Sequence, residues 1–335
     1  MVNNAEFGAE VPAEVGADVR NAAVCGHGGL GLGLDVGGTR TRWALALHDG
    51  SVLARGTVAP FSADQLNSSA GRQVVAVALD ELQAALSVHP RPQAVMAGIT
   101  GHDGSAGPDM ARVMALALNL PVRSLGLFND VELACRLAFQ PGGGALVYAG
   151  TGAIAVFVDA AQRSHLIGGR GALLGDEGGA HWIARQALAG LWRAEDDQPG
   201  SAQASALGQA LFESVGGARW DDTRRFVQAA SRGQMGQLAL QVAAAAQTDP
   251  QAMHWLVRAG QELARLAALM LARFGAMPLA LAGGAFKLHP AIEASMRGAL
   301  PPGTSLTRLD LDTEGWAARR AAQGLAHGMA QPLTQ

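Results

Sequence analysis

The 335-residue chain has few cysteines and few charged residues. Two cysteines, Cys25 and Cys135, are too few for a disulfide framework or a four-thiolate metal site, so we expect a reduced, cytoplasmic protein. Charged residues make up only 16% of the chain, and the formal net charge is −3. The basic surface that nucleic acids and anionic membranes bind is therefore missing. We expect neither nucleic acid nor a membrane among the partners of this protein.

The sequence also lacks a recognisable targeting or membrane-spanning segment. Residues 1–28 contain four acidic residues and neither a basic start nor an apolar run, so we expect a poorly ordered tail rather than a signal peptide. Residues 137–158 are uncharged, but Pro141 and several glycines make them a poor membrane helix. Two strands around a turn suit this segment better.

Hydrophobic residues and glycine are abundant. Hydrophobic residues form 49% of the chain, which is enough for large cores, and the length suits two domains of roughly 150 residues each. The 44 glycines are nearly twice the usual share of about 7%. They gather in short clusters, and clustered glycine is typical of tight turns and of backbone that approaches a ligand.

The hydrophobic pattern predicts the same order of elements twice. In the first half, period-two alternation and turn residues predict three strands, a helix, a strand, a helix opened by Pro108, a further strand and a helix. In the second half, three strands are followed by an alanine-rich helical region, two strands and a closing helix. Two α/β halves of like topology suggest a duplicated fold with a cleft between the halves. The expected strands are 30–35, 41–47, 52–58, 94–99 and 122–127, then 145–148, 154–158, 164–167, 279–281 and 304–309; the expected helices include 69–87 and 314–326, and the helical region is 177–275.

Each half begins with a hairpin on a glycine turn. The first turn contains Gly37, Gly38, Thr39 and Arg40, and the second contains Gly150, Thr151 and Gly152. Such a turn is either a plain hairpin or a place where backbone N–H groups meet phosphate. Two such turns at matching places favour phosphate binding, with one turn on each side of a triphosphate. Asp35, at the end of the first strand, is placed to hold Mg²⁺, if need be through water.

Four other polar or glycine-rich segments follow strands. Asp103, in a loop after a buried strand, is either part of an Asp-Gly turn or a base that takes a proton from an attacking hydroxyl. Asn129 and Asp130 either cap a helix or contact a metal or a sugar. Asp176, between glycines, is suited to accept hydrogen bonds from sugar hydroxyls. The pair Gly283-Gly284 would let an adenine lie against the backbone.

This combination resembles the N-acetylglucosamine kinase branch of the BadF/BadG/BcrA/BcrD ATPase family, in the actin, Hsp70 and sugar-kinase superfamily. The resemblance covers roughly residues 31–327. Its most specific part is the sugar-binding signature at residues 168–182, which includes Gly169, Arg170 and Asp176. The resemblance gives Asp103 the role of catalytic base and of a sugar contact. It gives phosphate or nucleotide binding to the two glycine turns and Gly283-Gly284, and sugar binding to Asn129, Asp130, Gly169, Arg170 and Asp176.

The resemblance implies an α/β fold of two ribonuclease-H-like (actin-like ATPase) domains with a central cleft. The N-terminal domain would be 29–128, with a closing helix 313–327 that packs back on it, and the C-terminal domain 129–312, with a helical insertion. The implied function is an ATP- and Mg²⁺-dependent amino-sugar kinase, with the 6-hydroxyl of N-acetylglucosamine as acceptor. Relatives also suggest a homodimer.

Three departures from the family pattern leave the sugar open. Arg170 stands where some relatives have an aromatic residue near the acetamido group, and Ala153 stands where serine is common. The segment 59–67 lacks the usual sugar-contacting asparagine at its expected place. Glucosamine, N-acetylmuramate and N-acetylmannosamine remain alternatives. Other functions are a family ATPase without kinase activity, such as an electron-transfer activator, and a sugar-sensing regulator.

Overall fold

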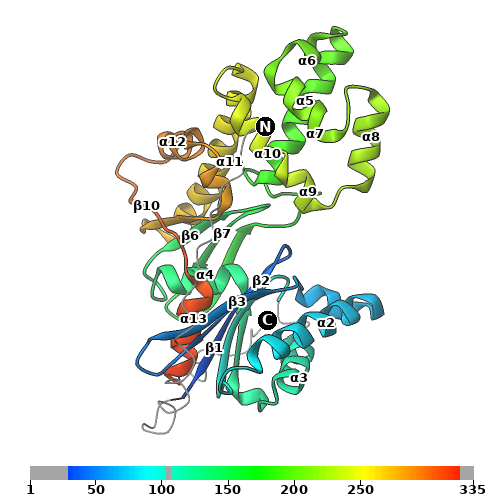
Figure 1. Cartoon of the computed structure of the whole chain (residues 1–335). Coiled ribbons are helices and arrows are strands. Elements are labelled where there is room, and N and C mark those ends of the chain that lie inside the picture. Colours follow the sequence, from blue (N-terminus) through cyan, green and yellow to red (C-terminus); the bar gives the residue numbers. More distant parts are fainter. Residues whose placement is uncertain (1–28, 103–106, 325–335) are drawn as a thin grey trace, which may run out of the picture.

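The computed structural model describes residues 29–102 and 107–324. These residues form two five-stranded sheets, one below and one above the middle of Figure 1. The first sheet has the strand order β3 (Val52–Val58), β2 (Thr41–Ala46), β1 (Gly31–Val36), β4 (Ala94–Ile99) and β5 (Leu125–Asn129). The second has the order β8 (Ser164–Gly168), β7 (Ala153–Val158), β6 (Ala145–Ala149), β9 (Leu279–Ala282) and β10 (Leu306–Arg308).

The two sheets have the same topology. In each, the first three strands in chain order form an antiparallel meander, a later strand pairs in parallel with the first one, and a last strand pairs in parallel with that later strand. The duplicated α/β fold expected from the order of elements is therefore confirmed. The ends of β1 and β6, which lead into the two glycine turns, occupy equivalent places.

The Leu-Gly alternation of β1 has a structural reason. Leu32 and Leu34 face the core formed with α2 (Ser69–Leu86) and α3 (Gly107–Leu118). Gly31 and Gly33 face the opposite way, where a Cβ atom would collide with the backbone of α13 (Thr313–Ala322). Glycine on this face lets a helix from the far end of the chain lie directly on the first sheet.

Two helices lie between the sheets. One is α13, and the other is α4 (Asp130–Ala138), which follows β5 (Figure 1). On α4, Leu133 packs with residues of the first sheet and of α13, whereas Ala134 and Cys135 pack with β6, β7 and β9 of the second sheet. The side chains of α4 thus join the two sheets through two small apolar clusters.

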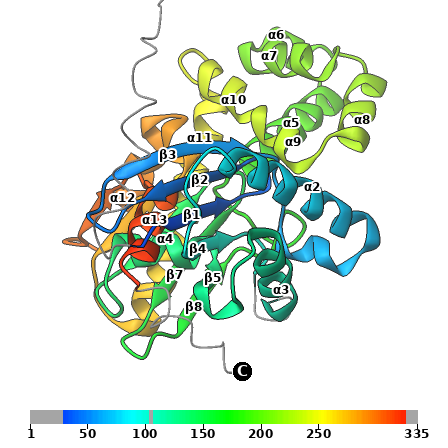
Figure 2. The ribbon, with the colours of Figure 1, turned by 60° about the horizontal axis from the view of Figure 1, so that its bottom comes forward.

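The expected helical region forms seven helices, α5 to α11, between β8 and the last strands. They share one large core with the second sheet, and most of them extend away from it at the top of Figure 2. Their bounds are α5 Ala180–Asp197, α6 Ser201–Ala204, α7 Ala206–Val215, α8 Trp220–Ala229, α9 Arg232–Gln237, α10 Ala239–Ala245 and α11 Pro250–Phe274, with α12 at Pro290–Ala299. No helix among the described residues is long and apolar enough to cross a membrane.

Two predicted strand or helix boundaries were wrong by three residues or more. The strand expected at 122–127 begins only at Leu125, because Val122–Ser124 forms a 3₁₀ turn in which Ser124 N–H donates to Pro121 C=O over 2.8 Å. The closing helix ends at Ala322, with Gln323 as its cap, rather than at 326. The predicted tail 1–28 and Asp103 lie outside the described residues.

Candidate active site

The first glycine turn joins β1 to β2 and is largely exposed. Gly37 N–H donates to Arg40 C=O over 3.2 Å, which closes the turn. Gly38 has no positive φ angle, and no atom lies within 4 Å of the place its Cβ would take. The fold would therefore accept a side chain at this position. Because the residue is glycine, the space beside the exposed backbone stays open.

Asp35, at the end of β1, forms an ion pair with Arg42 of β2. The same guanidinium lies 3.6 Å from Glu314 at the start of α13. The Asp35 side chain is about one-fifth exposed, with a relative accessibility of 19%. One arginine therefore connects the strand that precedes the first turn to the helix between the sheets.

Asp130 lies at the start of α4 beside the end of β4. Its Oδ2 accepts a hydrogen bond of 2.6 Å from the Thr100 hydroxyl, and the Thr100 N–H donates to Val36 C=O over 3.0 Å. Burial raises the pKa of Asp130, and the nearby charge of Asp35 raises it further. Asn129 is the N-cap of α4, because its side-chain oxygen accepts from Val131 N–H over 3.1 Å.

Tyr148 brings the second sheet to this cluster. It precedes the second glycine turn, and its ring lies 3.3 Å from the place a Cβ of Gly150 would take. Burial raises the pKa of Tyr148, and the negative charges of Asp35 and Asp130 contribute to the rise. These interactions show that the ends of β1, β5 and β6 converge.

The second glycine turn joins β6 to β7 and rests on the start of α5. Ala180 N–H donates to Gly150 C=O over 2.9 Å, and His181 N–H donates to Thr151 C=O over 3.0 Å. A Cβ at Gly179 would lie only 2.7 Å from the Cα of Gly152. The first turn of the helix and the glycine turn are therefore in direct backbone contact.

Asp176 lies beside this turn. Its carboxylate forms an ion pair with Arg232 of α9, and only 3% of its side chain is exposed. Asp176 has a φ angle of +64°, a left-handed conformation that is uncommon outside glycine. Arg232 was not among the residues predicted from the sequence.

The loop after β9 reaches the same place. Gly283 has a φ angle of +106°, and its Cβ would collide with the backbone of Ala149. Gly284, in contrast, faces open space. The expected nucleotide residues Gly283 and Gly284 thus lie next to the second glycine turn.

The other expected sugar residues follow β8. Gly169 N–H donates to Ala153 C=O over 3.1 Å, which holds the loop on the end of the second sheet. Arg170 is exposed and has no hydrogen bond or ion pair among the described residues. Residues 59–67 also contribute to the site: Ala63 N–H donates to Thr100 C=O over 2.9 Å, and the Asp64 carboxylate lies against Gly101, two residues before Asp103.

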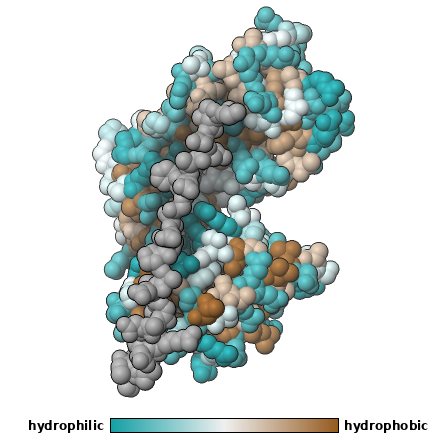
Figure 3. Space-filling view, in the orientation of Figure 1, coloured by the Kyte–Doolittle hydropathy of each residue, from teal (hydrophilic) through white to brown (hydrophobic). Residues whose placement is uncertain are grey.

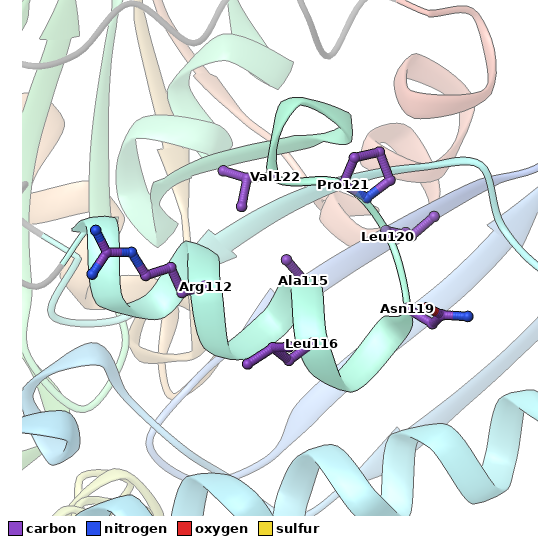
Figure 4. Close-up of a pocket in the computed structure, with 7 residues that line it drawn as sticks. All are labelled: Arg112, Ala115, Leu116, Asn119, Leu120, Pro121 and Val122. Atoms are coloured by element: carbon purple, nitrogen blue, oxygen red, sulfur yellow. The ribbon is translucent and has the colours of Figure 1, made fainter.

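A wide notch opens between the lower and upper parts of the molecule in Figure 3. A different hollow of about 640 Å³ lies at the end of α3, on the part that carries the first sheet (Figure 4). None of the expected site residues lines this hollow. Its lining residues are Arg112, Ala115, Leu116, Asn119, Leu120, Pro121 and Val122.

The site contains a carboxylate of the kind that binds Mg²⁺ beside phosphates. No group of three or more histidine, cysteine or acidic side chains fit to hold a metal occurs in the described part of the chain. Mg²⁺ in phosphate-transferring sites is usually held by one or two carboxylates, water and the substrate phosphates. Asp35 is a carboxylate of this kind, and its negative charge contributes to the raised pKa of Asp130 nearby.

Two equivalent sheets, each with a glycine turn after its first strand, define the duplicated ribonuclease-H-like fold of actin-like ATPases and sugar kinases. The chain belongs to the BadF/BadG/BcrA/BcrD ATPase family, whose model matches residues 32–298. A search of curated proteins finds no match.

Solved structures share this fold over most of the chain. A Chromobacterium violaceum protein, a proposed N-acetylglucosamine kinase, is 26% identical, with a TM-score of 0.67 over 89% of this chain and 99% of its own. A Porphyromonas gingivalis protein with the same proposed activity is 17% identical, with a TM-score of 0.66 over 87% and 98%. A ROK family glucokinase from Streptomyces griseus, in complex with glucose and AMPPNP, is 16% identical, with a TM-score of 0.55 over 90% and 100%.

Proposed function

We propose that this protein is an ATP- and Mg²⁺-dependent amino-sugar kinase that phosphorylates the 6-hydroxyl of N-acetylglucosamine. The observation that carries the proposal is the convergence of the ends of β1 and β6, each leading into a glycine turn, around Asp35, Asp130 and Tyr148. The family and the proposed activity of the Chromobacterium violaceum protein support a sugar kinase.

In this proposal the triphosphate lies between the two glycine turns. The turns offer backbone N–H groups, and Thr39 and Thr151 add hydroxyl donors. Gly283 and Gly284 follow a strand beside the second turn, which suits the adenosine end of the nucleotide. Mg²⁺ would neutralise phosphate charge, and Asp35 would hold its hydration shell if the nucleotide draws the carboxylate from Arg42.

The sugar would lie near the loop that follows β4. Thr100 connects this loop to Asp130, and Asp103 comes three residues later. In the proposal, Asp103 accepts the proton of the attacking hydroxyl, while Asn129, Asp130, Gly169, Arg170 and Asp176 hold the sugar. Asp64 is the polar residue of 59–67 that we propose in place of the usual asparagine, because it lies against Gly101. The homodimer and the cytoplasmic location remain predictions.

The surroundings of Cys135 favour a kinase over an electron-transfer activator, which would bind an iron–sulfur cluster through its cysteines. Cys135 is buried between α4 and the second sheet, and its thiol donates to Val156 C=O over 3.6 Å. An iron–sulfur cluster is usually held by four thiolates, and a dimer would need every cysteine of both chains. A thiol packed in this way is a poor cluster ligand.

The test is release of ADP from ATP across a panel of sugars. We expect turnover with N-acetylglucosamine or with one of the alternatives glucosamine, N-acetylmuramate and N-acetylmannosamine. We expect Asp103→Asn to lower kcat by about 10²–10⁴-fold, because general base catalysis is lost. Full activity of this variant would exclude Asp103 as the base, and ATP hydrolysis that no sugar stimulates would favour a family ATPase. Phosphorus-31 NMR of the product identifies the phosphorylated hydroxyl.

A further inference from the structure

An arginine from the helical region lies on the second glycine turn. Arg232 is the first residue of α9 and is 56 residues from Asp176 in the chain. A nitrogen of its guanidinium lies so near the place where a Cβ of Gly152 would be that the two atoms would collide. The absence of a side chain at Gly152 is thus what admits the guanidinium to the turn.

Asp176 holds this arginine from the other side. The Asp176 carboxylate accepts from Nη2 of Arg232, and it also lies 2.6 Å from the Cβ position of Gly152. A nearly buried carboxylate on a left-handed residue has little freedom to move. Strained backbone of this kind is retained where the surroundings fix it, and it is frequent at ligand sites.

Most hydrogen-bond donors of Arg232 remain available. A guanidinium has five N–H donors, and among the described residues only Nη2 of Arg232 has a partner. The side chain is 48% exposed, so a ligand in solvent can reach it at the turn. Arginine binds phosphate through two parallel hydrogen bonds. A carboxylate that binds one edge of the guanidinium leaves the donors on the other edges free to form these bonds.

Two arginines lie near this turn, Arg232 and Arg185, and both act on His181. Burial lowers the pKa of His181, and the charges of Arg232 and Arg185 lower it further. The only lysine of the chain, Lys287, forms an ion pair of 2.8 Å with Asp310. Phosphoryl transfer depends on positioning and on neutralising phosphate charge, and Arg232 supplies a positive charge at the second turn, where no lysine stands.

We propose that Arg232 binds the phosphate chain of the nucleoside triphosphate at the second glycine turn and that Asp176 positions it. This inference rests on the proposed function, which places the triphosphate at that turn. It also gives the helical region between β8 and β9 a direct part in nucleotide binding. Asp176 thereby acts on the nucleotide through Arg232, in addition to its proposed contact with the sugar.

The experiment measures binding of ATP and of adenosine, each with Mg²⁺ present, by isothermal titration calorimetry. A hydrogen bond to a charged group contributes about 1.5–3 kcal/mol, so we expect Arg232→Gln to weaken ATP binding roughly 10- to 150-fold. Adenosine binding should not change, because adenosine has no phosphate. Arg193→Gln, which removes an exposed and unpaired arginine of α5, is the matched control and should bind ATP like the wild type.

Arg232→Lys separates charge from geometry. It keeps the positive charge but not the planar pair of donors, so its ATP affinity should fall between those of the wild type and the glutamine variant. It also serves as the test protein if Arg232→Gln does not fold, as judged by circular dichroism.

Three outcomes would overturn the inference. In the first, Arg232→Gln binds ATP with the affinity of the wild type. If Arg232→Gln does not fold, the same result with Arg232→Lys counts as this outcome. In the second, the variant loses ATP and adenosine affinity equally, which would mean a structural role. In the third, the wild-type protein does not bind ATP. If the wild type binds ATP through Arg232 but phosphorylates no sugar, the inference holds and the proposed kinase function fails.

Discussion

We expect replacement of Gly179 by alanine to separate the second glycine turn from α5. Gly179 is the N-cap of α5 and has φ −75° and ψ 162°, values that alanine adopts without strain. Any effect of the substitution must therefore come from the added methyl group. In the folded protein this group would lie 2.6 Å from the carbonyl carbon of Gly152 and 2.7 Å from its Cα.

The size of the effect follows from this overlap. Fewer than one in ten Cβ contacts are shorter than 3.4 Å, so the two backbone segments must move apart by several tenths of an ångström. Inserting a methyl group into a packed place of this kind costs about 1–3 kcal/mol of stability. A 1 Å displacement of a reactive group can cost about 10²-fold in rate, so we expect kcat/KM for ATP to fall by about 10- to 100-fold.

Thermal unfolding and the ADP-release assay measure the two effects. Gly298→Ala is the matched control, because Gly298 lies in α12 with open space around it. In a helix, alanine is favoured over glycine by about 0.5–1 kcal/mol, so the control should raise the unfolding midpoint and leave activity unchanged. The reasoning is refuted if Gly179→Ala behaves as Gly298→Ala does in both assays.

Two further predictions concern buried titratable groups. Because burial raises the pKa of Asp130 above its ordinary 3.8, the folded protein keeps a proton that the unfolded chain has lost, and stability falls as the pH rises through this range. Asp130→Asn should therefore raise the unfolding midpoint at pH 7 more than at pH 4; equal midpoint shifts at both pH values would contradict this. Burial raises the pKa of the Cys135 thiol to about 11, so iodoacetamide at pH 8 should modify Cys135 only after unfolding, as mass spectrometry of its peptide would show. Labelling of the folded protein at the rate of an exposed thiol would show that α4 does not pack as described.

The local elements of this protein could be predicted from its sequence because they depend on neighbouring residues. Alternation with period two marks β1, and the Asp49-Gly50 pair marks the next hairpin. The main error was also local: Pro121 precedes a 3₁₀ turn, and apolar residues in that turn resemble a strand by composition alone.

The candidate site was predicted only in part. The two glycine turns, Asp35, Asp130 and Gly283-Gly284 stand at strand ends or beside them, and equivalent strands of a duplicated fold bring such ends together. Tyr148 could have been singled out, since it is the only tyrosine and directly precedes the Ala-Gly-Thr-Gly segment. From the sequence, Asn129 was either a helix cap or a ligand contact. The structure shows that its side chain caps α4.

The sequence alone determined the order of strands and helices along the chain and the positions of the two glycine turns, because period, proline and glycine act over a few residues. Only the tertiary structure decided which charges meet. Arg42 pairs with Asp35 across two strands, and Arg232 reaches Asp176 from a helix far along the chain. No local pattern encodes these partners, since ion pairing depends on the distance in space that the packed helices and sheets set.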